Sequence, residues 1–160
     1  MPTKKTIKKE VDSIQFTEIK KAVNQLLKER YPPPQYKIYG KEIKEGYDAP
    51  CFFTEIIDKG SRAQTKNFAQ GGFTVKIIYF QQEKNELDQL EKADEIKSLF
   101  GLVFCVGQRK LTVGECSHEF IGEYSDILEI SIDIDYMENT RRNETKPFME
   151  TLGMSMKAGK

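Results

Sequence analysis

The sequence has no excess charge of either sign and no long apolar run. Its 160 residues include 25 basic and 25 acidic side chains, so the formal net charge is zero. This balance argues against a dedicated nucleic-acid-binding protein, which needs a strong basic excess to neutralise phosphates. No apolar stretch approaches the roughly 20 residues of a membrane-spanning helix. Lys4 and Lys5 are followed by no hydrophobic segment, so the pattern of a secretory signal is missing as well.

Cysteine and histidine are also scarce. The three cysteines, Cys51, Cys105 and Cys116, are an odd number at wide spacing, which indicates reduced thiols in an intracellular protein rather than a disulfide framework. His118 is the only histidine, and no Cys-x-x-Cys or His-x-x-x-His spacing occurs. We therefore expect no metal site. Cys116 and His118 lie on the same expected strand face, where a nucleophilic pair would lack the aligned geometry that it needs.

Motifs for cofactor binding and for acid–base catalysis are missing too. Gly71 and Gly72 belong to no Gly-x-Gly-x-x-Gly or Gly-Lys-Ser/Thr fingerprint, and turn geometry explains them. Asp133 and Asp135 are paired carboxylates of the kind that can act as acid and base. Alternating acids on an exposed strand, however, usually face solvent. The sequence predicts no cofactor, no catalytic residue and no enzymatic activity.

Apolar residues at helical spacing predict two helices. The first begins near Thr17, whose hydroxyl is suited to cap it, and ends at Pro32-Pro33-Pro34. The second runs from about Lys84 to Phe100, with Gly101 as its C-terminal stop. Its expected buried side consists of Leu87, Leu90, Ala93, Ile96 and Leu99.

Six short strands are expected from runs of β-branched and aromatic residues. They cover 36–40, 51–57, 73–80, 102–106, 111–116 and 128–136. The segment 58–72 contains three glycines and no periodicity, so we expect a loop, and a loop of this length usually has a function. The last strand alternates apolar and mostly acidic residues, which places its apolar set on the core. We expect Leu26, Leu27, Val75, Ile77, Ile130 and Ile132 to be buried where the first helix meets the sheet.

The order α-β-β-β-α-β-β-β predicts the fold class. Consecutive strands favour an α+β domain with a mainly antiparallel sheet and two helices packed on one face. The length suits one such domain, expected over residues 14–137. Residues 1–13 are a Lys-rich extension that we expect to be mobile. Residues 138–160 are a polar tail, either disordered or ordered on a partner.

Charged residues of opposite sign gather on different expected elements. The segment 58–72 and the tip of the hairpin around residue 109 are basic, and the last strand is acidic. The basic residues are Lys59, Arg62, Lys66, Arg109 and Lys110, and the acidic residues are Glu129, Asp133 and Asp135. Such surfaces on a neutral protein suit head-to-tail contacts between subunits of a ring, although an ordinary mixed, solvated surface is the alternative.

The segment from Ile38 to Phe53 resembles the start of the small tail terminator proteins of phages of Gram-positive bacteria and of defective prophages. It reads Ile-Tyr-Gly-Lys-Glu-Ile-Lys-Glu-Gly-Tyr-Asp-Ala-Pro-Cys-Phe-Phe. A helix such as 17–31 precedes this string in that family. Later parts are similar as well: Ile78-Tyr79-Phe80, a following helix, Ile134-Asp135-Tyr136 and Met149-Glu150-Thr151-Leu152. The resemblance covers about Thr17 to Leu152, and the Lys-rich start departs from it.

The resemblance implies a homohexameric ring. In that family the ring caps the tail tube, ends its polymerisation and joins it to the head-side connector, and in a contractile tail it also meets the sheath. Expected partners are copies of the chain, the tube protein, the connector and the sheath, but no membrane, and DNA is only cargo in the lumen. The expected location is the host cytoplasm during assembly and then the head-proximal end of the virion tail. Glu129, Asp133 and Asp135 would line the lumen or contact the next subunit.

Two other functions stay open at this point. One is a different head–tail completion or connector subunit, and the other is a small ligand-binding or enzymatic α+β domain.

Overall fold

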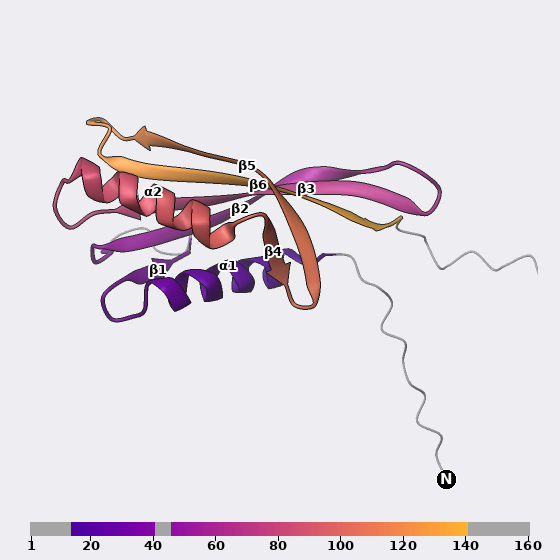
Figure 1. Ribbon diagram of the computed structural model, residues 1–160, viewed down its shortest axis with the longest axis horizontal. Coiled ribbons are helices and arrows are strands. Elements are labelled where there is room, and N and C mark those ends of the chain that lie inside the picture. The colour runs from indigo at the N-terminus through magenta and orange to yellow at the C-terminus, as the bar shows by residue number, and fades with distance from the viewer. Residues whose placement is uncertain (1–13, 41–45, 141–160) are drawn as a thin grey trace, which may run out of the picture.

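The computed structural model describes residues 14–40 and 46–140 (Figure 1). Its elements are α1 (Phe16–Arg30), β1 (Lys37–Tyr39), β2 (Cys51–Ala63), β3 (Phe68–Phe80), α2 (Glu86–Phe100), β4 (Val103–Val106), β5 (Arg109–Ile121) and β6 (Ile127–Asn139). The expected order α-β-β-β-α-β-β-β is confirmed. The expected extension 1–13 lies outside the described residues, as does 141–160 of the expected tail. The strand β6 continues to Asn139, past residue 137 at which the sequence placed the end of the domain.

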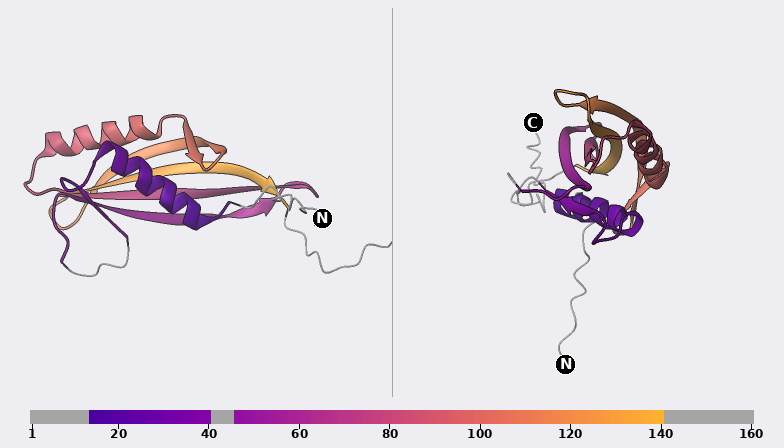
Figure 2. Two further views of the ribbon diagram at one scale, coloured as in Figure 1. Left: turned by 90° about the horizontal axis from the view of Figure 1, so that it is seen from below. Right: turned by 90° about the vertical axis from the view of Figure 1, so that its left-hand side faces the viewer.

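The strands form one six-stranded sheet in the order β1-β2-β3-β6-β5-β4. Only β1 and β2 run parallel, and the other neighbours are antiparallel. The sheet curls, and both helices cover its inner face (Figure 2). The α+β fold with a mainly antiparallel sheet is therefore confirmed.

The core lies between this inner face and the two helices. Alternate residues of β3 and β6 point inward, as period two requires, and belong to the same buried cluster as the apolar side of α1. Of the residues expected to be buried, Leu27, Val75, Ile77, Ile130 and Ile132 are fully enclosed, and Leu26 is partly buried against them. The sequence thus predicted correctly which face of each strand is internal.

The start of α1 differs from the prediction. Gln15 is the N-cap residue, and its side chain makes no capping hydrogen bond. The backbone carbonyl of Gln15 already accepts the N–H groups of Glu18 and Ile19 at 3.1 Å each. Thr17 therefore lies inside the first turn, and the prediction that it caps the helix is wrong. The end is as expected, because Tyr31 closes the last turn directly before the prolines.

The segment 58–72 is not a loop, and that prediction is wrong. It forms the outer half of the hairpin of β2 and β3, each of which has 13 residues. The ladder continues past a bulge between Asp58 and Ser61, where Gly60 adopts a φ of +82°. Glycines in the segment hide the alternation of apolar and polar residues. Gly71 is required by packing, since a Cβ there would lie 2.5 Å from the ring of Tyr136 on β6. We call residues 58–73 the arm, which extends beyond both helices (Figure 1).

The buried side of α2 is only partly as predicted. Ala93 and Ile96 are buried, but Leu87 is 71% exposed and Leu90 is 37% exposed. The inward positions next to Ala93 are taken by Gln89 and Lys92 instead. The helix is rotated relative to its leucine stripe, and for Leu87 and Leu90 the prediction is wrong.

Candidate assembly surface

Most of the predicted basic residues come together on the arm and beside it. Two shallow adjoining depressions lie on this part of the surface. One is lined by Lys59 and Arg62, the other by Arg109 and Lys110, and Gln70 and Asp135 belong to both. Lys66 lies outside these linings, in the turn at the arm's tip. The structure thus joins two sequence-distant basic segments into one groove, which we call the basic groove.

The predicted acidic row is largely engaged inside the chain. Asp133 lies 3.4 Å from Lys59 on β2 and accepts the Thr74 hydroxyl at 2.6 Å. Glu129 is buried and accepts the Lys76 ammonium at 2.7 Å, which raises the pKa of that lysine. Part of the predicted opposite-sign contact, the pair of Lys59 and Asp133, is therefore formed within one molecule.

Two large apolar side chains accompany the cations, and sequence reasoning missed both. Phe68 is 50% exposed and Met137 is 53% exposed. The ladder places Gln70 directly between Arg62 on β2 and Met137 on β6, so these three share the sheet face opposite the helices. Phe68, two residues before Gln70, is on the same face. Phe68 and Gln70 alternate with Ala69 and Gly71. This alternation would have predicted that Phe68 is exposed, had the segment been recognised as a strand.

Among the described residues, the side chains that could take part in catalysis show few features of a catalytic centre. Among residues 14–40 and 46–140, no three His, Cys, Asp or Glu side chains gather as metal ligands would. His118 is exposed on β5 and meets the Phe120 ring edge-on at 5.9 Å. Burial raises the pKa of Cys116 and raises that of Cys51 to about 11. Both groups therefore stay protonated thiols, which are poor nucleophiles.

No helix in the described segments is long and apolar enough to cross a membrane.

Residues 18–146 match a family model described as phage tail terminator protein. The chain belongs to this family. Twenty solved chains resemble it, and one of them, which carries no functional name, aligns over 100% of its own length and 82% of this chain. The identity of that pair is 14% and the TM-score 0.50, so it supports the fold alone. No curated protein matches.

Membership of the tail terminator family places the chain in the phage tail. The family consists of structural virion proteins, so the chain is a structural tail component that associates with other tail components. The resemblance to tail terminators, which covered about Thr17 to Leu152, is confirmed over residues 18–146.

Proposed function

We propose that this tail terminator is the subunit of a homohexameric ring at the head-proximal end of the tail tube. The ring ends tube polymerisation and joins the tube to the head-side connector. The family match over residues 18–146 is the observation that carries this proposal. During assembly the protein is in the host cytoplasm, and it then stays in the virion tail. In a contractile tail the ring also contacts the end of the sheath.

The basic groove supports contacts between copies. Arg62, Lys66 and Lys110 are exposed, and the Arg109 guanidinium donates to the backbone carbonyl of Met137 at 2.6 Å. Arginine, methionine and aromatic side chains are enriched at protein interfaces. Replacing Arg62 and Lys66 by Glu should weaken subunit association and make it more sensitive to salt. An unchanged oligomer mass in the double variant, measured at several salt concentrations, would remove the arm from the interface.

The acidic row has two candidate roles, lining the lumen through which DNA passes or contacting the next subunit. Carboxylates in the lumen would repel phosphates. Glu129 and Asp133 are paired with lysines of their own chain, so a lumen role depends mostly on Asp135, which is exposed. Changing Asp133 and Asp135 to Lys discriminates: intact rings with impaired DNA passage indicate the lumen, and absent rings indicate the interface.

Tube growth gives a direct test of the proposal. Purified protein added to polymerising tail tube protein should bind tube ends and shorten the tubes, as measured by negative-stain electron microscopy. Tubes that grow to the same lengths with and without the protein would contradict termination. Binding to the connector without any effect on growth would instead indicate another head–tail completion subunit.

A further inference from the structure

The outer side of α2 carries a stripe of apolar and acidic side chains that do not pack in the core. Leu87, Leu90, Glu91 and Asp94 are three or four residues apart, so they line one side of the helix. All four are exposed, although the leucines fit the helical period of the core. Glu83 and Glu86 are exposed just before and at the start of the helix. We call Leu87, Leu90, Glu91 and Asp94 the α2 stripe.

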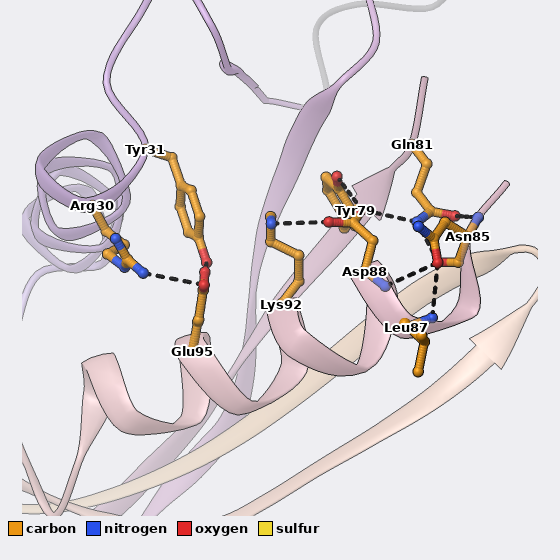
Figure 3. A network of polar contacts seen from close by, with 9 residues as sticks. All are labelled: Arg30, Tyr31, Tyr79, Gln81, Asn85, Leu87, Asp88, Lys92 and Glu95. Carbon is orange, nitrogen blue, oxygen red and sulfur yellow. Dashed lines mark hydrogen bonds and ion pairs between the residues drawn. The ribbon is translucent and has the colours of Figure 1, made fainter. Parts of the chain in front are cut away.

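A polar network on the inner side holds α2 in the orientation that exposes the stripe (Figure 3). The Asn85 side chain accepts the backbone N–H of Leu87 and of Asp88, which starts the helix. Asp88 binds the buried Lys92 ammonium at 3.1 Å and the Tyr79 hydroxyl at 2.9 Å. Figure 3 shows Leu87 pointing away from these groups. The exposure of the stripe is therefore fixed by the fold.

Lys92 strengthens this anchoring. Its ammonium lies 5.6 to 5.8 Å from the ring centroids of Tyr31, Tyr36 and Tyr79, within the range of cation–π attraction. One turn further along, Glu95 accepts the Tyr31 hydroxyl and pairs with Arg30 at 3.1 Å. Contacts to α1 and β3 thus prevent α2 from rotating to bury its leucines.

The arm and the end of β6 that pairs with it present the complementary chemistry. Phe68 and Met137 provide an exposed apolar pair, and Arg62 lies beside them on the same sheet face. Lys66 follows at the tip of the arm. An apolar pair bordered by cations matches an apolar pair bordered by carboxylates in both sign and chemical type.

The two surfaces cannot meet within one molecule. The tip of the arm and the N-terminal half of α2 lie at opposite ends of the long axis (Figure 1). The acids of β6 are weaker candidates for the arm's partner, since Glu129 and Asp133 already have lysine partners. We propose that the arm of one copy docks on the α2 stripe of a second copy. This inference rests on the proposed ring, for which it names the contact: two different surfaces meet head to tail, the type of contact that closes rings.

Two complementary variants test the docking. Leu87→Lys/Leu90→Lys places cations opposite the basic arm, and Phe68→Glu/Met137→Glu places acids opposite the acidic stripe. Each variant alone should self-associate at least about tenfold more weakly than the wild type, both in solution and at the ends of tail tubes. An equimolar mixture should restore association in native mass spectrometry, as one-to-one dimers or as alternating assemblies in which the new acids meet the new cations. The reason is that one variant keeps the arm and the other keeps the stripe.

The control is Leu102→Lys, since Leu102 is 81% exposed and lies elsewhere, at the start of the β4–β5 hairpin. This variant should assemble like the wild type, and thermal unfolding should show that all variants fold. Wild-type assembly by the α2 variant, or a mixture that stays monomeric, would overturn the docking. Rings of normal mass that no longer bind tubes would assign the stripe to the tube protein and also overturn it. A wild-type chain that neither forms rings nor stops tube growth would instead contradict the proposed function itself.

Discussion

At the residue scale, Lys92 explains why the hydropathy pattern of α2 predicted the wrong side of the helix to be buried. A pattern of leucines predicts that lysine faces water. Here burial opposes the charge, but the hydrogen bond to Asp88 and the charges of nearby acidic groups raise the pKa of Lys92 instead. The ammonium, with its four-carbon stem, therefore replaces an apolar side chain in the packing. The periodicity of α2 contains no information about the tyrosines around Lys92. They come from other segments: the end of α1, the loop after Pro34, and β3.

Asp88 gives this network a measurable dependence on pH. Burial opposes ionisation of Asp88, but hydrogen bonds from Gln81, Tyr79 and Lys92 hold its pKa below the ordinary value of 3.8. A lowered pKa in the folded state stabilises the protein above that ordinary value, and this contribution is lost as pH falls through the folded pKa. Asp88→Asn should therefore unfold at a lower urea concentration at pH 7, and its deficit should shrink towards pH 2. A deficit that does not vary with pH would contradict a role for the carboxylate's charge.

The central position of Ile132 gives the second residue-scale prediction. Ile132 is fully buried on β6, opposite Val75 on β3. Ile132→Ala should lower the free energy of unfolding by roughly 2–5 kcal/mol, since it removes buried methyl groups and leaves a cavity. The exposed Leu102 is the matched control, and Leu102→Ala should change stability by less than about 0.5 kcal/mol. A similar small loss for Ile132→Ala in urea unfolding would mean that this face of β6 is not the core.

At the scale of elements, the sequence predicted the number, type and order of helices and strands but not their length in the arm. The strands 51–57 and 73–80 were recognised from their β-branched and aromatic residues, which pack under the helices. Their continuations to Ala63 and from Phe68 contain glycines, charged and polar residues and no β-branched residue. Those residues form strand because β6 continues alongside β3 as far as Asn139, a long-range pairing that local patterns do not encode. Arg62 and Arg109 were among the basic residues singled out from the sequence, but their meeting in one groove was not predicted, and the exposed Phe68 and Met137 beside it were missed.

Gly71 tests the packing that keeps the arm in register. A methyl group there would overlap the Tyr136 ring at 2.5 Å, so the ring has to move. Gly71→Ala should cost roughly 1–3 kcal/mol of stability, the usual penalty for overpacking. Tyr136→Leu in the same chain should relieve the overlap, so that the two changes together cost less than their sum in urea unfolding. Strictly additive costs would show that the ring does not determine the choice of glycine.

At the scale of the whole molecule, a neutral chain with charged and apolar surfaces at its two ends is suited to head-to-tail assembly. The arm and the α2 stripe are built by different elements and stay apart in one molecule. The exposed side chains of both surfaces, such as Arg62, Phe68, Leu87 and Glu91, lie outside the core, so selection for folding alone does not account for them. Assembly accounts for both, and it agrees with membership of the tail terminator family.

Imaging of finished tails shows directly whether the chain forms the terminal ring. Cryo-electron microscopy of tails that carry a tagged copy of this chain should show it as a closed ring of six copies at the head-proximal end of the tube, between the last tube ring and the connector. The ring should be absent from tails assembled without the chain, and those tails should have uncontrolled length. Tag density distributed along the tube, or at the host-facing tip, would contradict the proposed function.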